Sequence, residues 1–371
     1  MPPRHAAGAM NVRAALAPAR PAHSSHAANA PAAARDDALD GMRAAATLLV
    51  ILIHVGAQGF GRLGERHWWA VNAWESMARV SVPLFFMLTG ALLLARSHTV
   101  TSLGRRIWRV ALPLAAWSVL YLLWFRHAGQ HHENWPALIV AGPVVGHLWY
   151  LYALIGAYVF VPVLAAFHQH SSVSIKLFCL LFWFIGATLV PLEVTFTAAR
   201  TVGVDWAVLP LYAGYMALGA LLYHGLPALP GARLRAGAWL GWALLSAAIA
   251  LATWWRSVTL GQSNETFYVY ASPLVALSSV AAFVALRALG AAWLPAGSRR
   301  QRAVAWFAAT SFGVYLVHVW VLFVLEGYGI NYRFINPWLG VPLLTLAAAA
   351  LSALLVGVLQ AIPLVRAIVP R

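Results

Sequence analysis

Two ionisable side chains interrupt the first long apolar run of the chain, LDGMRAAATLLVILIHVG at residues 39–56. Arg43 and His54 are eleven positions apart, about 20° more than three full helical turns, so a helix would carry both on one face, roughly 16 Å apart. An imidazole can take a proton from a hydroxyl group, and a guanidinium can hold a phosphate through two hydrogen bonds. The pair therefore predicts a site that holds a phosphorylated molecule at one end and reacts at the other.

Each of these side chains also has an explanation without function. Arg43, at the cytoplasmic boundary, can anchor the helix, and His54, near the bilayer centre, can be hydrogen-bonded to a neighbouring helix. An ionisable group at that depth is still a functional hypothesis by default. Asp40 lies three residues before Arg43, where it can orient the guanidinium or, more simply, cap the helix start. Acyl-coenzyme A, with phosphates at one end of a long flexible arm, has the shape that a functional pair would require.

The elements that position these residues are predicted to be membrane-spanning helices. Of the 371 residues, 62% are hydrophobic and only 9% are charged, and the mean hydropathy is +0.74, which is unlike a soluble domain. Runs of about 20 apolar residues recur and are apolar on every side, which favours helices over a β-barrel. We therefore expect an all-α polytopic membrane protein in a lipid bilayer. Its ten expected segments are 42–61, 80–95, 107–125, 147–167, 176–193, 207–224, 236–255, 268–287, 304–325 and 338–364.

The distribution of positive charge predicts the orientation of these segments. With a cytoplasmic N-terminus, 17 of the 25 Lys and Arg residues lie in inward segments and seven in outward loops, Arg43 being the other one. The positive-inside rule then places both termini in the cytoplasm, and this arrangement argues against nucleic acid as a partner. The outward charged residues are Arg62, Arg66, Arg79, Arg126, Arg200, Arg256 and Arg333, with Glu65, Glu75, Glu133, Glu193, Asp205, Glu265 and Glu326.

Two parts of the chain differ in composition. Residues 1–38 are rich in Ala and Pro and lack hydrophobic periodicity, so we expect a disordered cytoplasmic tail. This tail lacks the apolar segment of a secretory leader, and both Met1 and Met10 are candidate start residues. Residues 39–371 are expected to form one transmembrane domain. The single Cys179 excludes an intramolecular disulfide.

Several common reaction centres are not indicated. The run HHE at 131–133 and the pair His168 and His170 lack further ligands in the sequence, so a metal site is not expected. The chain has no P-loop, no dinucleotide-binding glycine motif, and neither H-E-x-x-H nor G-x-S-x-G. ATP hydrolysis and serine hydrolase chemistry are therefore disfavoured.

Five segments in the same order give the chain a resemblance to the acyltransferase 3 family of integral membrane proteins. The family has D-x-x-R followed by a histidine in its first helix, a second helix reading PlFFmlSG, and R-x-x-R at the inner end of its third. The corresponding residues are Asp40, Arg43 and His54; VPLFFMLTG at 82–90, where Thr89 replaces the usual serine; and Arg106 with Arg109. HLWYLYALIGAYVFVP at 147–162 and SFGVYLVHVWVL at 311–322 resemble the fourth-helix and late-helix signatures.

The resemblance implies transfer of an acyl group from cytoplasmic acyl-coenzyme A, with acetyl-coenzyme A the expected donor. The acceptor would be a hydroxyl of an extracytoplasmic or lipid-linked sugar of the cell envelope, and no tightly bound cofactor is expected. His54 would act as general base or would carry the acyl group itself. Arg43, Arg106 and Arg109 would bind the phosphates of coenzyme A, although Arg106 and Arg109 can equally be topology anchors.

Two further groups of residues are weaker candidates. Tyr315 and His318 are neighbours on one helix face. Either can be a core residue satisfied by a neighbouring helix, or both can support the site, His318 by facing the acceptor or by assisting His54. Aromatic residues at the outer end of 147–167 can stack on a sugar ring or form an interfacial belt. These residues are His147, Trp149 and Tyr150.

The sequence leaves two classes of function open. In the first, the protein is an O-acetyltransferase in the inner membrane of a bacterium. In the second, it is a transporter, such as a polysaccharide exporter, in which His54 and His318 couple protons or bind substrate. A catalytically inactive scaffold is disfavoured because Asp40, Arg43 and His54 are all present.

Overall fold

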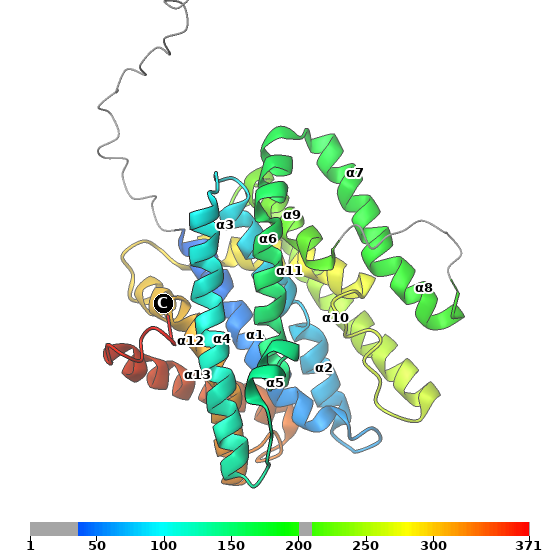
Figure 1. Ribbon diagram of the computed structural model, residues 1–371. Helices are drawn as coiled ribbons and strands as arrows, with labels where there is room; N and C mark the ends of the chain where they lie inside the picture. Colours follow the sequence, from blue (N-terminus) through cyan, green and yellow to red (C-terminus); the bar gives the residue numbers. More distant parts are fainter. Residues whose placement is uncertain (1–35, 200–209, 371) are drawn as a thin grey trace, which may run out of the picture. The chain divides into compact units, whose positions relative to one another are not determined.

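The computed structural model describes residues 36–199 and 210–370, and this part of the chain is helical, without a strand (Figure 1). A 3₁₀ turn, η2, precedes α6, and a π-helical turn, η3, joins α7 to α8. In chain order the elements are α1 (Asp37–Phe60), α2 (Trp68–Ala78), α3 (Ser81–Leu93), α4 (Val100–His127), α5 (Trp135–Ala141), η2 (Gly146–Leu148), α6 (Trp149–His170), α7 (Val173–Phe184), η3 (Ile185–Leu189), α8 (Val190–Thr197), α9 (Leu211–Gly225), α10 (Ala232–Leu260), α11 (Pro273–Trp293), α12 (Arg299–Gly327) and α13 (Pro337–Ala361).

The predicted all-α polytopic membrane fold is confirmed. Among the described residues, nine helical segments are long and apolar enough to cross a membrane. The one expected segment without a counterpart among these nine is 207–224. It corresponds to α9, but its first residues lie outside the described part, as do Arg200 and Asp205 of the outward loops. The predicted tail also lies outside it up to residue 35, and α1 begins at Asp37, two residues before the predicted domain boundary.

The second span starts earlier than the sequence predicted. It runs from Trp68 to Leu93 through α2 and α3, and not from residue 80. Glu75 and Arg79, expected in an outward loop, are instead buried and paired with each other. Asn72 is also buried and donates to the carbonyl oxygen of Ala250 at 2.9 Å. The segment Trp68–Leu93 is apolar enough for a span in spite of these polar residues, which find partners inside the protein.

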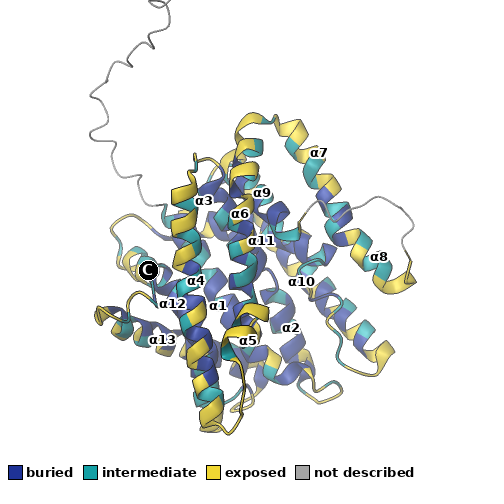
Figure 2. Ribbon diagram, viewed as in Figure 1, coloured by how far each residue is buried: buried dark blue, intermediate teal, exposed yellow. Residues whose placement is uncertain are grey.

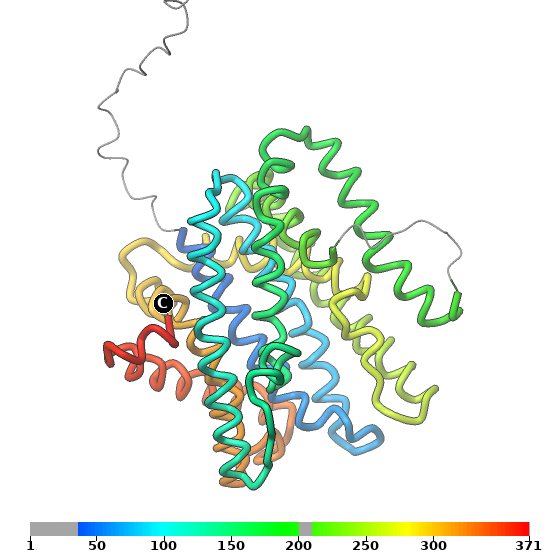
Figure 3. The backbone as a smooth tube through the Cα atoms, viewed as in Figure 1, coloured from blue at the N-terminus to red at the C-terminus, as the bar shows by residue number. Residues whose placement is uncertain are grey.

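α1 lies inside the bundle and packs against α2, α3, α11, α12 and α13 (Figures 1 and 3). Most of its residues are buried, whereas α7, α8 and α10 carry many exposed residues, as Figure 2 shows. The exposed residues of these three helices include large apolar side chains. Exposed apolar surface on these helices is expected where a protein faces lipid. Most residues of α1 are therefore held in a helical core.

Side-chain caps mark the starts of α4 and α12, the helices that carry Arg106, Arg109 and His318. Thr99 caps α4, because its hydroxyl accepts from the backbone N–H of Ser102 at 3.2 Å while Ser102 accepts from the N–H of Thr99 at 3.1 Å. Ser298 caps α12 by accepting from the N–H of Gln301 at 3.1 Å. Caps of this kind satisfy backbone donors that a helix leaves unpaired at its start. They set the starts of α4 and α12, and hence the positions of the arginines and histidine farther along these helices.

Two glycines allow α3 and α9 to pack with their backbones in contact. A Cβ atom added to Gly90 would lie 1.9 Å from the carbonyl oxygen of Met216, and one added to Gly219 would lie 2.1 Å from that of Met87. Because the atoms that an added methyl group would meet belong to the backbone, no side-chain rotation could remove the clash. The final glycine of the VPLFFMLTG segment thus has a packing role, as small residues commonly do between membrane helices.

Gly90→Ala is therefore expected to destabilise the protein by about 1–3 kcal/mol, because α3 and α9 must separate to accommodate the methyl group. Thermal unfolding in detergent would show a lower midpoint. Gly104→Ala is the matched control, since Gly104 is inside α4 with nothing within 4 Å of an added Cβ. That change should cost nothing and can stabilise by up to about 1 kcal/mol. Equal melting of the Gly90 variant and the wild type would refute the close-packing argument.

Candidate functional site

Three histidines from distant parts of the chain meet around the second half of α1. His54 comes from α1, His147 from η2 and His318 from α12. The ring centroids are 5.0 Å apart for His54 and His318, 6.0 Å for His54 and His147, and 5.2 Å for His147 and His318. We call these residues the histidine cluster. It joins three of the residues that the sequence analysis singled out separately.

The tautomer of His318 follows from its hydrogen bonds. Its Nδ1 lies 2.7 Å from the carbonyl oxygen of Tyr315 and 3.3 Å from that of Val314. Carbonyl oxygens only accept, so Nδ1 carries the proton and Nε2 has a free lone pair. Nε2 is buried and has no hydrogen-bond partner within the described part of the chain. His318 can therefore accept a proton or a hydrogen bond from a group next to it.

Two tyrosines hold the turn that carries His147. The hydroxyl of Tyr315 donates to the carbonyl oxygen of His147, which connects α12 to η2. The ring of Tyr121 lies 5.4 Å from that of His147, and its hydroxyl donates to the carbonyl oxygen of Leu316 at 3.0 Å. Tyr315, which the sequence analysis left between a core and a supporting role, thus orients a member of the histidine cluster. Tyr121 was missed, because an aromatic residue in an apolar helix carries no distinguishing signal.

His54 differs from the other two histidines in its exposure and its place along the helix. His147 and His318 are buried, whereas His54 is partly exposed. It lies six residues before α1 ends at Phe60 and 17 after the helix begins at Asp37. His54 is therefore in the C-terminal half of α1. Partial exposure at this point is what a group that meets a substrate needs.

A buried carboxylate contacts α1 next to His54. A Cβ atom on Gly56 would lie 2.6 Å from Cγ of Glu75 and 3.0 Å from its Oε1, so only glycine lets α2 approach this closely. Glu75 forms an ion pair with Arg79, whose guanidinium lies over the ring of Tyr268 at 3.9 Å. The sequence analysis missed this pair. Gly56, two positions after His54 in a helix, was the one available signal of a close neighbour.

The three predicted arginines line one pocket at the other end of α1. Arg43 of α1 and Arg106 and Arg109 of α4 surround a cavity of about 360 Å³, which we call the arginine pocket. Arg43 pairs with Asp40 at 3.3 Å. Asp40 lies inside α1, in its first turn, so the capping role expected as the simpler explanation is wrong, and Asp40 orients the guanidinium instead. One helix thus connects the arginine pocket to the histidine cluster.

A comparison with models of protein families shows which family the chain belongs to. Residues 36–357 match the family model described as an acyltransferase domain, of the acyltransferase 3 type. The chain belongs to the acyltransferase 3 family. The protein is therefore a multi-pass membrane acyltransferase, and the enzyme class is confirmed over the transporter alternative. Searches of curated proteins and of solved structures found no match.

Two more of the residues predicted for the acyltransferase, Trp149 and Tyr150, make aromatic contacts. Tyr150 is buried, with its ring 5.6 Å from that of Tyr315 and 5.1 Å from that of Phe86. Trp149 stacks on Tyr270 at 5.6 Å. Tyr150 thus packs beside Tyr315, next to the histidine cluster, and is not part of an exposed aromatic belt.

The hydroxyl of Thr89, the residue that departs from the family pattern, donates to the carbonyl oxygen of Phe85 at 2.8 Å. This bond lies within α3. A serine would satisfy its hydroxyl in the same way, so the departure leaves the local structure intact.

No group of three or more His, Cys, Asp or Glu residues with the geometry of a metal site occurs in residues 36–199 and 210–370. The three clustered histidines are included in that statement. Imidazole rings such as these can transfer protons or act as nucleophiles.

Proposed function

We propose that this acyltransferase moves an acetyl group from cytoplasmic acetyl-coenzyme A to a hydroxyl of an extracytoplasmic or lipid-linked sugar of the bacterial cell envelope. One observation carries the proposal: α1 bears both Arg43, in the arginine pocket, and His54, in the histidine cluster. Eleven residues of helix separate them by roughly 16 Å along the axis. An extended carrier held by its phosphates at Arg43 can direct its thioester toward His54.

The arginine pocket supplies the charge that the carrier requires. Coenzyme A has phosphate groups at one end, and guanidinium groups bind phosphate oxygens in pairs. Arg43 is held toward the pocket by Asp40, so less side-chain freedom is lost on binding. Apolar side chains such as Leu154 and Phe312 line the same pocket and offer a surface for the nucleotide base.

In the proposed reaction His54 removes the proton from the acceptor hydroxyl as its oxygen attacks the thioester carbonyl carbon. The carbon–sulfur bond then breaks, and the departing thiolate takes the proton from His54 and leaves as coenzyme A thiol. The lone pair on Nε2 of His318 can accept a hydrogen bond from the His54 ring and so select which His54 nitrogen acts as base. Alternatively, His54 itself takes the acetyl group and passes it on.

Arg106→Ala and Arg109→Ala are each expected to weaken acetyl-coenzyme A binding by at least about tenfold, the loss of one charge-assisted contact. Arg105→Ala is the matched control. Arg105 is an exposed neighbour in α4 that lies outside the pocket and bonds only to the carbonyl oxygen of Thr101, at 3.4 Å. Equilibrium binding of radiolabelled acetyl-coenzyme A to protein in nanodiscs measures all three. Equal losses for Arg105→Ala would mean that the pocket is not the binding site.

The function itself is tested by release of free thiol from acetyl-coenzyme A by purified protein in nanodiscs, with and without a membrane sugar extract. Turnover that depends on the extract is expected. Absence of acetyl-coenzyme A binding by the wild type would show that the donor is wrong, and an acyl-coenzyme A series of increasing chain length would then identify the donor.

A further inference from the structure

The structure contains a second cationic cavity, at the opposite end of α1 from the arginine pocket. It has a volume of about 640 Å³, within the range of about 300–1,000 Å³ typical of small-molecule sites. We call it the outer pocket, because the positive-inside rule places this end of α1 outside the cytoplasm. The charged and polar side chains that line it include Arg62, Glu65, Arg66, His67, Tyr332, Arg333 and Asn336.

The walls of the outer pocket are fixed by contacts with α1 and α2. Tyr332, a buried residue of the lining, donates its backbone N–H to Oε1 of Gln58 at 3.2 Å. Trp68, also buried, donates its indole N–H to the carbonyl oxygen of Phe60 at 2.8 Å. Both loops that form the pocket are therefore attached to the end of α1. These contacts fix part of the lining of the cavity, which reduces the cost of ordering on binding.

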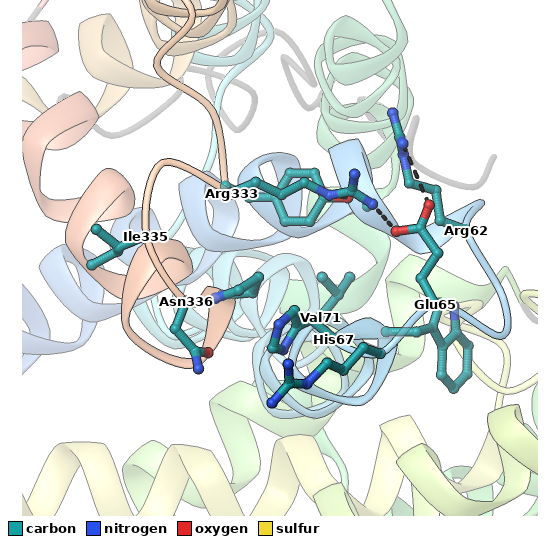
Figure 4. A pocket seen from close by; sticks show the side chains of 12 residues that line it. Arg62, Glu65, His67, Val71, Arg333, Ile335 and Asn336 are labelled. Carbon is teal, nitrogen blue, oxygen red and sulfur yellow. Dashed lines mark hydrogen bonds and ion pairs between the residues drawn. The ribbon is translucent and has the colours of Figure 1, made fainter.

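The charge of the outer pocket is not explained by membrane topology. Three arginines and one glutamate give it a net charge of +2, on the side of the membrane where the positive-inside rule does not call for arginine. Arg333 pairs with Glu65, and Arg62 approaches the same carboxylate at 3.5 Å (Figure 4). One carboxylate is thus shared by two arginines, and Arg66 adds a further positive charge. The pocket offers excess guanidinium donors to an anion.

The outer pocket lies close to the histidine cluster. Gln58, which holds Tyr332, is one helical turn beyond His54 and on the same face of α1. Gly59, in the lining of the pocket, is five residues from His54, roughly 7.5 Å along the axis and about 140° around it, compared with roughly 16 Å along the axis from His54 to Arg43. A glycan of several rings whose charged group sits in the outer pocket would have to extend around the end of α1 to bring a hydroxyl group to His54.

We infer that the outer pocket binds the carboxylate or phosphate of an anionic acceptor glycan, and that the acceptor of this enzyme is therefore an acidic or phosphorylated glycan. The inference rests on the proposed function, in which the acceptor is a sugar. Arg66 and Arg333 contact the anion, His67 and the amide of Asn336 donate to neighbouring hydroxyls, and Glu65 holds Arg62 and Arg333 in place.

The test is direct binding of three trisaccharides of equal length to the full-length protein in phosphatidylcholine nanodiscs. One ends in glucuronate, one in glucose 6-phosphate, and one in unmodified glucose. We expect at least one charged trisaccharide to bind about tenfold or more tightly than the neutral one, with the better of the two identifying the anion. Arg66→Gln and Arg333→Gln should each remove most of that preference. Arg126→Gln, an exposed outward arginine at the end of α4, should retain it.

Three results would overturn the inference. They are equal binding of charged and neutral trisaccharides, the same loss of preference in Arg126→Gln, and loss of trisaccharide binding when phosphatidylglycerol is added to the nanodiscs, which would assign the pocket to a lipid headgroup. Acetyl-coenzyme A binding, measured on the same samples, separates the two proposals. Acetyl-coenzyme A binding without a preference for charge refutes the outer-pocket inference alone, and the reverse refutes the proposed donor alone.

Discussion

His54→Ala is expected to lower the rate of acetyl transfer by about 10²–10⁴-fold, the usual contribution of a general base, while leaving acetyl-coenzyme A binding nearly unchanged. The reason is the separation of the two sites along α1. The phosphates would bind at the arginine pocket, roughly 16 Å from the imidazole, so removing the ring should affect the chemical step and not the capture of the donor. Thiol release and equilibrium binding, measured on the same preparation, give both quantities.

His224→Ala provides the control for loss of a histidine elsewhere in the bundle. His224 lies on α9, where its Nε2 is 3.1 Å from the carbonyl oxygen of Ala91, and its ring is next to that of His168. This variant should turn over at the wild-type rate. If His54→Ala lost donor binding as well as turnover, His54 would be a structural residue. If it retained both, the base would have to be another member of the histidine cluster.

Acid quenching during turnover separates the two roles considered for His54. An acetyl-imidazole intermediate would leave labelled acetyl on the wild-type protein and none on His54→Ala. A general base leaves no label on either. His54 is partly exposed, whereas His147 and His318 are buried. As a general base or as an acyl carrier, His54 is therefore the member of the histidine cluster best placed to contact the acceptor or the thioester.

Helix periodicity was enough to predict those parts of the site that depend on one helix. Arg43 and His54 were placed on one face by their spacing alone, and Arg106 and Arg109 were placed on the side of Arg43 by charge distribution. The structure brings the three arginines to a single pocket. Predictions of this kind succeed because the geometry within a helix is fixed by its own hydrogen bonds.

Distances between helices were beyond the sequence, because they depend on packing between residues far apart in the chain. Nothing in the pattern around His147 indicates that its ring lies 5.2 Å from that of His318, more than 170 residues later. The role of Asp40 was misjudged for a related reason. The helix begins at Asp37, four residues before the start at Gly41 that a cap at Asp40 requires, and this start could not be read from an apolar pattern.

The greatest failure of the sequence prediction, the location of Glu75 and Arg79, leads to the largest expected effect on stability. Glu75 is 0% exposed and its Oε1 has no hydrogen-bond partner within the described part of the chain, so Arg79 is the group that compensates its charge. Arg79→Ala should destabilise the protein by about 3–5 kcal/mol, because a buried carboxylate would be left without a partner. Thermal unfolding in detergent and the yield of folded protein measure this loss. Arg62→Ala, which breaks the exposed pair with Glu65, should cost no more than about 1 kcal/mol.

A double replacement, Glu75→Leu with Arg79→Met, distinguishes a structural pair from one that also serves the reaction. Apolar residues of similar volume often replace a buried ion pair without loss of stability, so the double variant should melt near the wild type. Glu75 packs against Gly56, two residues from His54, and the guanidinium of Arg79 lies over Tyr268. If the pair only supports the fold, the stable double variant will transfer acetyl groups at the wild-type rate. If its charges position His54, the same variant will fold, bind acetyl-coenzyme A and turn over slowly. Unchanged melting of Arg79→Ala would instead show that Glu75 is protonated or hydrated in the folded protein and needs no partner.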